Sequence, residues 1–200
     1  MVLLRRFASF IFIVSLCGLS ASAAEPQSSE GYDYRVLSTT KTSTMEKEMN
    51  EAASAGFRME KVMGGQTAVG GSEVVVIMAK PKSQKGSVSY AYKLLATKKT
   101  STMQKELQEV GDEGFDYKDQ TVFNSAFGGD EVVVILEADR SISSKIRYEY
   151  KLLATTKTST MEKELQEAGD AGFKFVGVTV SKTSFGGKEI VSILRREGAR

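Results

Sequence analysis

Histidine and tryptophan are absent from the 200-residue sequence, and its one cysteine, Cys17, lies close to the N-terminus. Without histidine the chain cannot form a Ser-His-Asp triad. Without cysteine beyond the N-terminal segment it has no thiol nucleophile, no Cys/His zinc site and no disulfide. We therefore predict no catalytic residue, no metal ligand and no cofactor. The alternative is an enzyme that works with carboxylate, lysine or tyrosine side chains alone.

Residues 1–24 have the three zones of a secretory signal peptide. Two arginines at positions 5 and 6 precede the apolar run FASFIFIVSL, and the segment ends in GLSASAA. Ten apolar residues are too few for a membrane span, which needs about 20. We predict cleavage after Ala23 or Ala24 and an exported protein, periplasmic or secreted, with an uncleaved anchor as the alternative. Leu16 stands where a lipobox has a small residue, so Cys17 is expected to leave with the signal peptide.

Loss of that segment removes the net charge, because 27 − 2 = 25 Lys and Arg then face 25 Asp and Glu. Nucleic acids and anionic membranes attract proteins with a net basic field. We predict no nucleic-acid partner and no membrane span in the mature chain. The charge is uneven, however: residues 90–139 carry 5 − 10 = −5. This acidic stretch favours a basic partner, although neutral surface drift explains it equally well.

One unit occurs three times, at a spacing of 58 residues and without insertions. Its copies begin YDYRVLSTTKTSTM, YAYKLLATKKTSTM and YEYKLLATTKTSTM. Such internal repetition indicates tandem structural repeats. The predicted boundaries are a linker at 25–31, repeat 1 at 32–81, a linker at 82–89, repeat 2 at 90–139, a linker at 140–147, and repeat 3 with a C-terminal tail at 148–200.

Each unit opens with an alternating segment typical of a half-buried strand. A serine followed three residues later by glutamate or glutamine then indicates a capping box and a helix start. These pairs are Ser43/Glu46, Ser101/Gln104 and Ser159/Glu162.

The helix has one apolar face, formed in the third copy by Met161, Leu165 and Ala168. It is expected to end at a left-handed glycine followed by an apolar residue, as in Gly172-Phe173. Glycine pairs later in each unit predict a hairpin turn. The last strand is an unbroken apolar run in two copies, VVVIM and VVVIL, which indicates burial on both faces and a central position.

The sequence therefore predicts an α+β protein: three tandem β-α-β-β units, each a three-stranded sheet with one helix, packed on one another. Units of about 50 residues without a disulfide or metal are marginal alone. One helix also covers only one face of its sheet. Mutual packing, or packing on partner chains, covers the other.

The pattern YEYKLL, then ELQEAGDAGFKFV, then a glycine turn and ILRR resembles the bacterial DUF4177 family, whose small domains have no established function. The resemblance covers all three copies and implies the unit's fold, with no functional residue to carry over. Two features depart from the family: phenylalanine at positions 57, 115 and 173 where the family usually has tryptophan, and the Lys-Thr-Ser-Thr segment before the helix.

Three sets of repeated residues are candidate sites. Lysine and serine at each helix start can hold an anion such as phosphate or sulfate, although helix capping also explains them. These residues are Lys41, Ser43, Lys99, Ser101, Lys157 and Ser159. Glu48 and Glu51 can form a carboxylate pair or a solvated helix face. The tyrosine pairs 32/34, 90/92 and 148/150 can stack on carbohydrate or peptide, or pack against a neighbouring copy.

These observations predict an exported, non-catalytic binding or scaffold protein built from three repeats. Its partner is a protein or a small anionic ligand, and oligomers are possible. A hydrolase or lyase of the cell envelope that uses carboxylate, lysine or tyrosine is the alternative.

Overall fold

The computed structural model describes residues 31–67, 71–84, 89–124, 130–142, 146–182 and 187–198. Repeat 1 comprises β1 (Tyr32–Thr39), α1 (Thr42–Ser54), β2 (Arg58–Thr67) and β3 (Gly71–Pro81). Repeat 2 comprises β4 (Tyr90–Thr97), α2 (Thr100–Asp112), β5 (Asp116–Asn124) and β6 (Asp130–Asp139). Repeat 3 comprises β7 (Tyr148–Thr155), α3 (Thr158–Asp170), β8 (Lys174–Lys182) and β9 (Lys188–Glu197). The predicted signal peptide and most of the predicted glycine turns lie outside the described residues.

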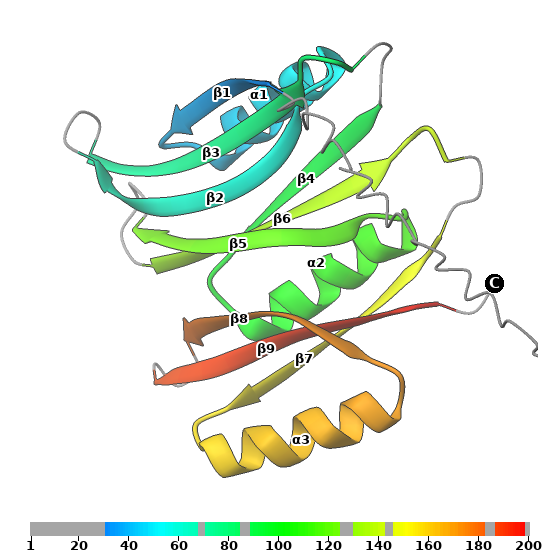
Figure 1. Cartoon of the computed structure of the whole chain (residues 1–200). Helices are drawn as coiled ribbons and strands as arrows, with labels where there is room; N and C mark the ends of the chain where they lie inside the picture. Colours follow the sequence, from blue (N-terminus) through cyan, green and yellow to red (C-terminus); the bar gives the residue numbers. More distant parts are fainter. Residues whose placement is uncertain are drawn as a thin grey trace, which may run out of the picture.

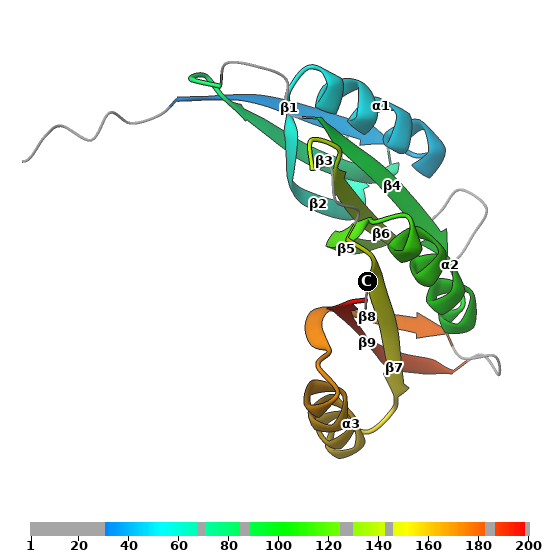
Figure 2. The same ribbon diagram turned by 90° about the vertical axis from the view of Figure 1, so that its right-hand side faces the viewer.

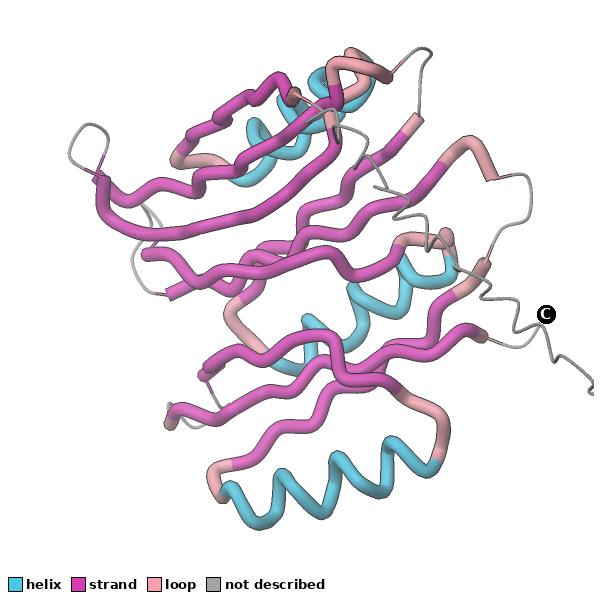
Figure 3. The backbone as a smooth tube through the Cα atoms, viewed as in Figure 1, coloured by secondary structure: helices cyan, strands magenta, loops and turns pink. Residues whose placement is uncertain are grey.

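The last strand of each repeat lies between the other two. The strand orders are β1-β3-β2, β4-β6-β5 and β7-β9-β8, and both neighbours of each central strand run antiparallel to it. Figure 3 shows the resulting three separate sheets, each with one helix. The predicted α+β architecture and the central position of the apolar strand are confirmed.

The three repeats pack on one another in series (Figure 1). One core joins α1 and the inner face of the first sheet to Tyr92, Val133 and Ile135 of repeat 2. A second core joins α2 and the opposite face of the second sheet to Tyr150 and Ile193 of repeat 3. Figure 2 shows α1 against β4 and α2 beside β7. The predicted mutual packing is confirmed.

Burial of the apolar strands follows from this order. Residues 132–138 of β6 are all buried, because repeat 2 has a neighbour on each side. In β3 the burial alternates: Val74, Val76 and Met78 are buried, whereas Val75 and Ile77 on the other face are half-buried. Burial on both faces is therefore confirmed for repeat 2 and is wrong for repeat 1, because none of the described repeats lies against its outer face.

The helix ends agree with the sequence only at the C-terminal side. Gly56, Gly114 and Gly172 have φ of +89°, +90° and +83°, and the N–H of each following phenylalanine bonds back into the helix. This confirms the left-handed C-cap. At the other end, the N-cap residues are Lys41, Lys99 and Lys157, and no side chain caps these helices. The predicted capping box is wrong.

None of the three described helices is long and apolar enough to cross a membrane.

Candidate functional site

Glu46 and Asn50 of α1 bond to the backbone of the next repeat instead of capping their own helix. The Leu94 N–H donates to Glu46 Oε2 at 2.9 Å. The Tyr92 N–H donates to Asn50 Oδ1, and Asn50 Nδ2 donates to the Tyr92 carbonyl, both at 3.0 Å. These contacts satisfy the outward backbone groups of edge strand β4, which would otherwise be free to pair with another chain.

The second junction repeats this chemistry with glutamines. Gln104 of α2 accepts from the Leu152 N–H at 2.8 Å and donates to the Tyr150 carbonyl at 2.9 Å. Gln108 accepts from the Tyr150 N–H at 3.1 Å. The helix of one repeat therefore holds the first strand of the next by side-chain hydrogen bonds, at the same positions each time.

A tyrosine of that first strand is buried at both junctions. Tyr92 is 2 % exposed, and its hydroxyl accepts from the Met59 N–H and donates to Glu137 Oε2, both at 2.8 Å. Tyr150 is 4 % exposed and donates to the Phe115 carbonyl at 3.0 Å. Burial raises the pKa of both phenols. For these two residues, packing against the neighbouring copy is confirmed.

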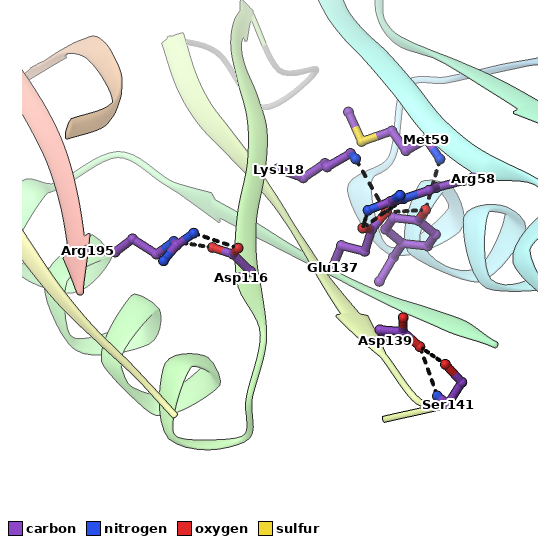
Figure 4. Close-up of polar contacts among 9 residues, drawn as sticks. Arg58, Met59, Asp116, Lys118, Glu137, Asp139, Ser141 and Arg195 are labelled. Carbon is purple, nitrogen blue, oxygen red and sulfur yellow. Dashed lines mark hydrogen bonds and ion pairs between the residues drawn. The ribbon is translucent and has the colours of Figure 1, made fainter. Parts of the chain in front are cut away.

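Each junction also carries an ion pair, and the two pairs have opposite polarity (Figure 4). At the first, Arg58 of repeat 1 approaches Glu137 of repeat 2, with Nη2 at 2.7 Å from Oε1. At the second, Arg195 of repeat 3 donates from Nη2 to Oδ2 of Asp116 of repeat 2 at 2.9 Å. Positions 116 and 195 correspond to 58 and 137 one repeat later. The basic partners of acidic repeat 2 are thus its own neighbours.

Arg58 and Glu137 of the first ion pair and Asp116 of the second line one polar groove of about 380 Å³. Repeat 2 contributes most of the lining, with Arg58 from repeat 1 and Tyr148 from repeat 3. Burial raises the pKa of Asp116, while the nearby Arg195 opposes the shift. Asp139 accepts two hydrogen bonds from Ser141, which lower its pKa. Glu137 and Asp116 each face an arginine, so neither is arranged as a free general base.

Metal binding has no support in the part of the chain that the structure describes. There, no group of three or more His, Cys, Asp or Glu residues is placed to hold an ion.

The six predicted anion-binding residues are all exposed, and each lysine–serine pair lies at the start of its own helix. At α2 the Thr100 hydroxyl donates to Glu189 Oε1 of repeat 3 at 2.5 Å. A carboxylate of the protein therefore already lies beside the first turn of that helix. The Glu51 carboxylate is 3.8 Å from Lys47 Nζ on an exposed surface of α1, which agrees with a solvated helix face.

Among the described residues, no helix or sheet of another repeat covers the outer face of the first sheet. Tyr34 occupies the position of Tyr92 and Tyr150, yet its side chain is 64 % exposed. Val36, at 66 %, and Met63, at 57 %, lie on the same face, as the strand register shows. The ring of Tyr32 lies 6.2 Å from that of Tyr34. We call Tyr32, Tyr34, Val36 and Met63 the N-terminal end face.

Repeat 3 is open at the opposite end. Met161 and Leu165 of α3 are half-buried, whereas the corresponding residues of α1 and α2 are fully buried. Beside them on β8, Phe175, Val178 and Val180 are each about half exposed. We call Leu165, Phe175, Val178 and Val180 the C-terminal end face. The nearly identical repeat sequences predict neither end face, although the first and last members of any series lack one neighbour.

Replacing Arg58 by methionine is expected to lower the free energy of unfolding by about 1–2 kcal/mol, because nearly buried Glu137 loses its main partner. Adding Glu137→Leu should restore only part of the loss: an apolar pair often replaces a buried ion pair without cost, but the buried Tyr92 hydroxyl then loses its acceptor. Urea unfolding of the wild type, both single variants and the double variant measures the coupling. Additive losses would contradict the assignment of this pair to the junction.

Comparisons of the chain with family models, with curated proteins and with solved structures find no match.

Proposed function

We propose that the mature protein is an exported, non-catalytic binding or scaffold protein, and that it binds a protein partner through its N-terminal end face. One observation carries the proposal: the same sheet face is closed by protein at two junctions and open in repeat 1. Tyr92 and Tyr150 are 2 % and 4 % exposed, against 64 % for Tyr34. Contiguous exposed apolar surface is typical of protein-interaction sites.

The backbone of β1 supports the same proposal. The outward N–H and C=O groups of β4 and β7 are held by side chains of the preceding helix. No helix precedes β1 in the described part of the chain, so its edge is open to side-chain or backbone donors and acceptors. Proteins commonly recognise such an edge by adding hydrogen bonds along it.

The proposed export rests on the N-terminal sequence. The resemblance to DUF4177 concerns the repeat unit alone. The absence of histidine, and of cysteine outside the predicted signal peptide, favours binding over catalysis, because these are the most versatile catalytic side chains. Two carboxylates of the polar groove, Glu137 and Asp116, are engaged by arginines of neighbouring repeats, which also favours a structural role for them.

The proposal is tested by placing the photo-crosslinking residue p-benzoylphenylalanine at position 34 in cells that make the full chain. Mass spectrometry of the exported protein is expected to find Ala24 or Glu25 first. Irradiation is expected to yield a defined protein adduct at position 34. The matched control places the probe at Lys47, a 79 % exposed side chain of α1, and is expected to yield none.

The absence of an adduct at position 34, or the same adducts at both positions, would overturn the proposed binding face. An activity of the pure protein that is lost when Glu48, Glu106 and Glu164 are replaced together, with the fold intact, would establish the enzyme alternative instead.

A further inference from the structure

The two junctions inside the chain show which partner fits the open faces. At each, a helix presents two polar side chains to the first strand of the next repeat, and a tyrosine of that strand enters the shared core. The same pair of surfaces is thus joined twice within one molecule. Repeat 1 presents the first-strand surface of such a pair at one end of the molecule, and repeat 3 presents the helix surface at the other.

Helix α3 keeps the residues that receive a first strand. Glu162 corresponds to Glu46 and Gln104, and Gln166 corresponds to Asn50 and Gln108. The described part of the chain contains no further repeat whose first strand could lie against α3. Gln166 donates to Asp170, one turn further along the same helix, as Gln108 donates to Asp112 at the formed second junction.

A glycine in α3 gives the same indication. At Gly111 of α2, an added Cβ would lie 2.4 Å from the Tyr148 carbonyl oxygen, so the close approach of β7 requires glycine. The corresponding Gly169 of α3 has nothing within 4 Å of that point. Glycine inside a helix is less favourable than alanine. Within one molecule nothing described requires Gly169, whereas a first strand docked as closely as β7 docks on α2 would.

The N-terminal end face carries the complementary groups. Tyr34 has the position of the two buried tyrosines, and Arg35 has that of Lys93, whose Nζ lies 3.8 Å from Glu46 Oε1. Arg35 of one molecule would therefore face Glu162 of another. Lys174 of repeat 3 corresponds to Arg58 and Asp116, and Ala79 of repeat 1 corresponds to Glu137 and Arg195. Docking of the two ends therefore brings no like charges together at this position.

We propose that the C-terminal end face of one molecule receives the N-terminal end face of a second copy of this chain, so that the mature protein assembles head to tail. The proposal rests on the proposed function and names its partner. Such a heterologous contact uses different surfaces on the two molecules and produces either closed rings or growing chains. Repeat proteins that stay monomeric end in repeats with polar outer faces. The described outer faces of repeats 1 and 3 instead expose apolar side chains.

The test uses two variants of the mature protein, each blocked at one end. Tyr34→Glu places a charge on the N-terminal end face, and Gly169→Leu fills the space that a first strand would occupy. Analytical ultracentrifugation of the wild type is expected to show masses that grow with protein concentration. Each variant alone is expected to stay monomeric. An equimolar mixture is expected to form a dimer and nothing larger, because the one intact face of each variant complements that of the other.

Lys163→Leu is the matched control, because it adds the same side chain to α3 outside the contact. Its counterparts Lys47 and Lys105 remain 79 % exposed beside the formed junctions. This variant is expected to assemble like the wild type. Urea unfolding of Tyr34→Glu and Gly169→Leu checks that both are folded, as expected from the exposure of Tyr34 and the open space around Gly169.

A wild type that stays monomeric at every concentration, or a mixture that stays monomeric, would overturn head-to-tail assembly. Loss of assembly in Tyr34→Glu alone, with Gly169→Leu unaffected, would indicate a symmetric dimer and would also overturn it. If the crosslink at position 34 then joins a different protein, the proposed function stands and only self-assembly fails. A crosslink between two copies supports both.

Discussion

Replacing Tyr150 by alanine is expected to lower the free energy of unfolding by about 3–5 kcal/mol, whereas the same change at Tyr34 should cost less than about 0.5 kcal/mol. The two tyrosines have the same place in the repeat and chemically similar neighbours, YDYRVL against YEYKLL, which makes them a matched pair. Tyr150 is 4 % exposed in the core shared by repeats 2 and 3, and its hydroxyl satisfies the Phe115 carbonyl. Tyr34 is 64 % exposed.

Urea denaturation followed by circular dichroism measures both losses, at a protein concentration low enough to keep the chain monomeric. The loss at Tyr150 includes a cavity and an unsatisfied carbonyl, so it should exceed that of Tyr150→Phe, which removes the hydroxyl alone. Equal effects of alanine at the two positions would show that the junction contributes little to stability.

Replacing Gly111 by leucine is expected to cost about 3 kcal/mol or more, because the new side chain must displace the backbone of β7. A Cβ at this position would lie 2.4 Å from the Tyr148 carbonyl oxygen and 2.9 Å from the Tyr150 ring. A backbone strand held by several hydrogen bonds cannot move aside as a flexible side chain can. Repeat 1 has a buried Ala53 here, so the first junction accepts one carbon atom beyond glycine.

The control is Gly169→Leu, at the same helical position with nothing within 4 Å. In the monomer this change is expected to raise stability by up to about 1 kcal/mol, because leucine favours the helix over glycine. Thermal or urea unfolding of both variants compares them directly. A loss at Gly169 as large as that at Gly111 would mean that the glycines serve the helix itself and not the approach of a strand.

The parts of the fold that depend on neighbouring residues could be predicted from the sequence. The alternating first strand, the apolar central strand and the Gly-Phe helix end all follow from local periodicity and backbone preference. The structure of the helix start could not be predicted in the same way, because Glu46 can bond either to the backbone of its own helix start or to another strand. Its own helix start lies close in the sequence, but the strand it bonds lies 48 residues away.

The polar groove had no local signal either. Each of its ion pairs joins residues 79 positions apart, and nothing near Arg58 or Glu137 in the sequence points to the other. The end faces were missed for a different reason. Tyr34, Tyr92 and Tyr150 lie in nearly identical sequence contexts, and their burial depends only on whether another repeat lies against them.

The opposite polarity of the two ion pairs makes the repeats non-interchangeable, although their sequences remain close. A chain carrying repeat 2 twice in succession would place Asp116 of the first copy against the Glu137 position of the second, two carboxylates in a nearly buried site. Joining repeat 1 directly to repeat 3 would set Arg58 against Arg195. Like charges at such positions oppose docking. The charges at these two positions therefore favour the observed order of the repeats, much as complementary charges select partners in coiled coils.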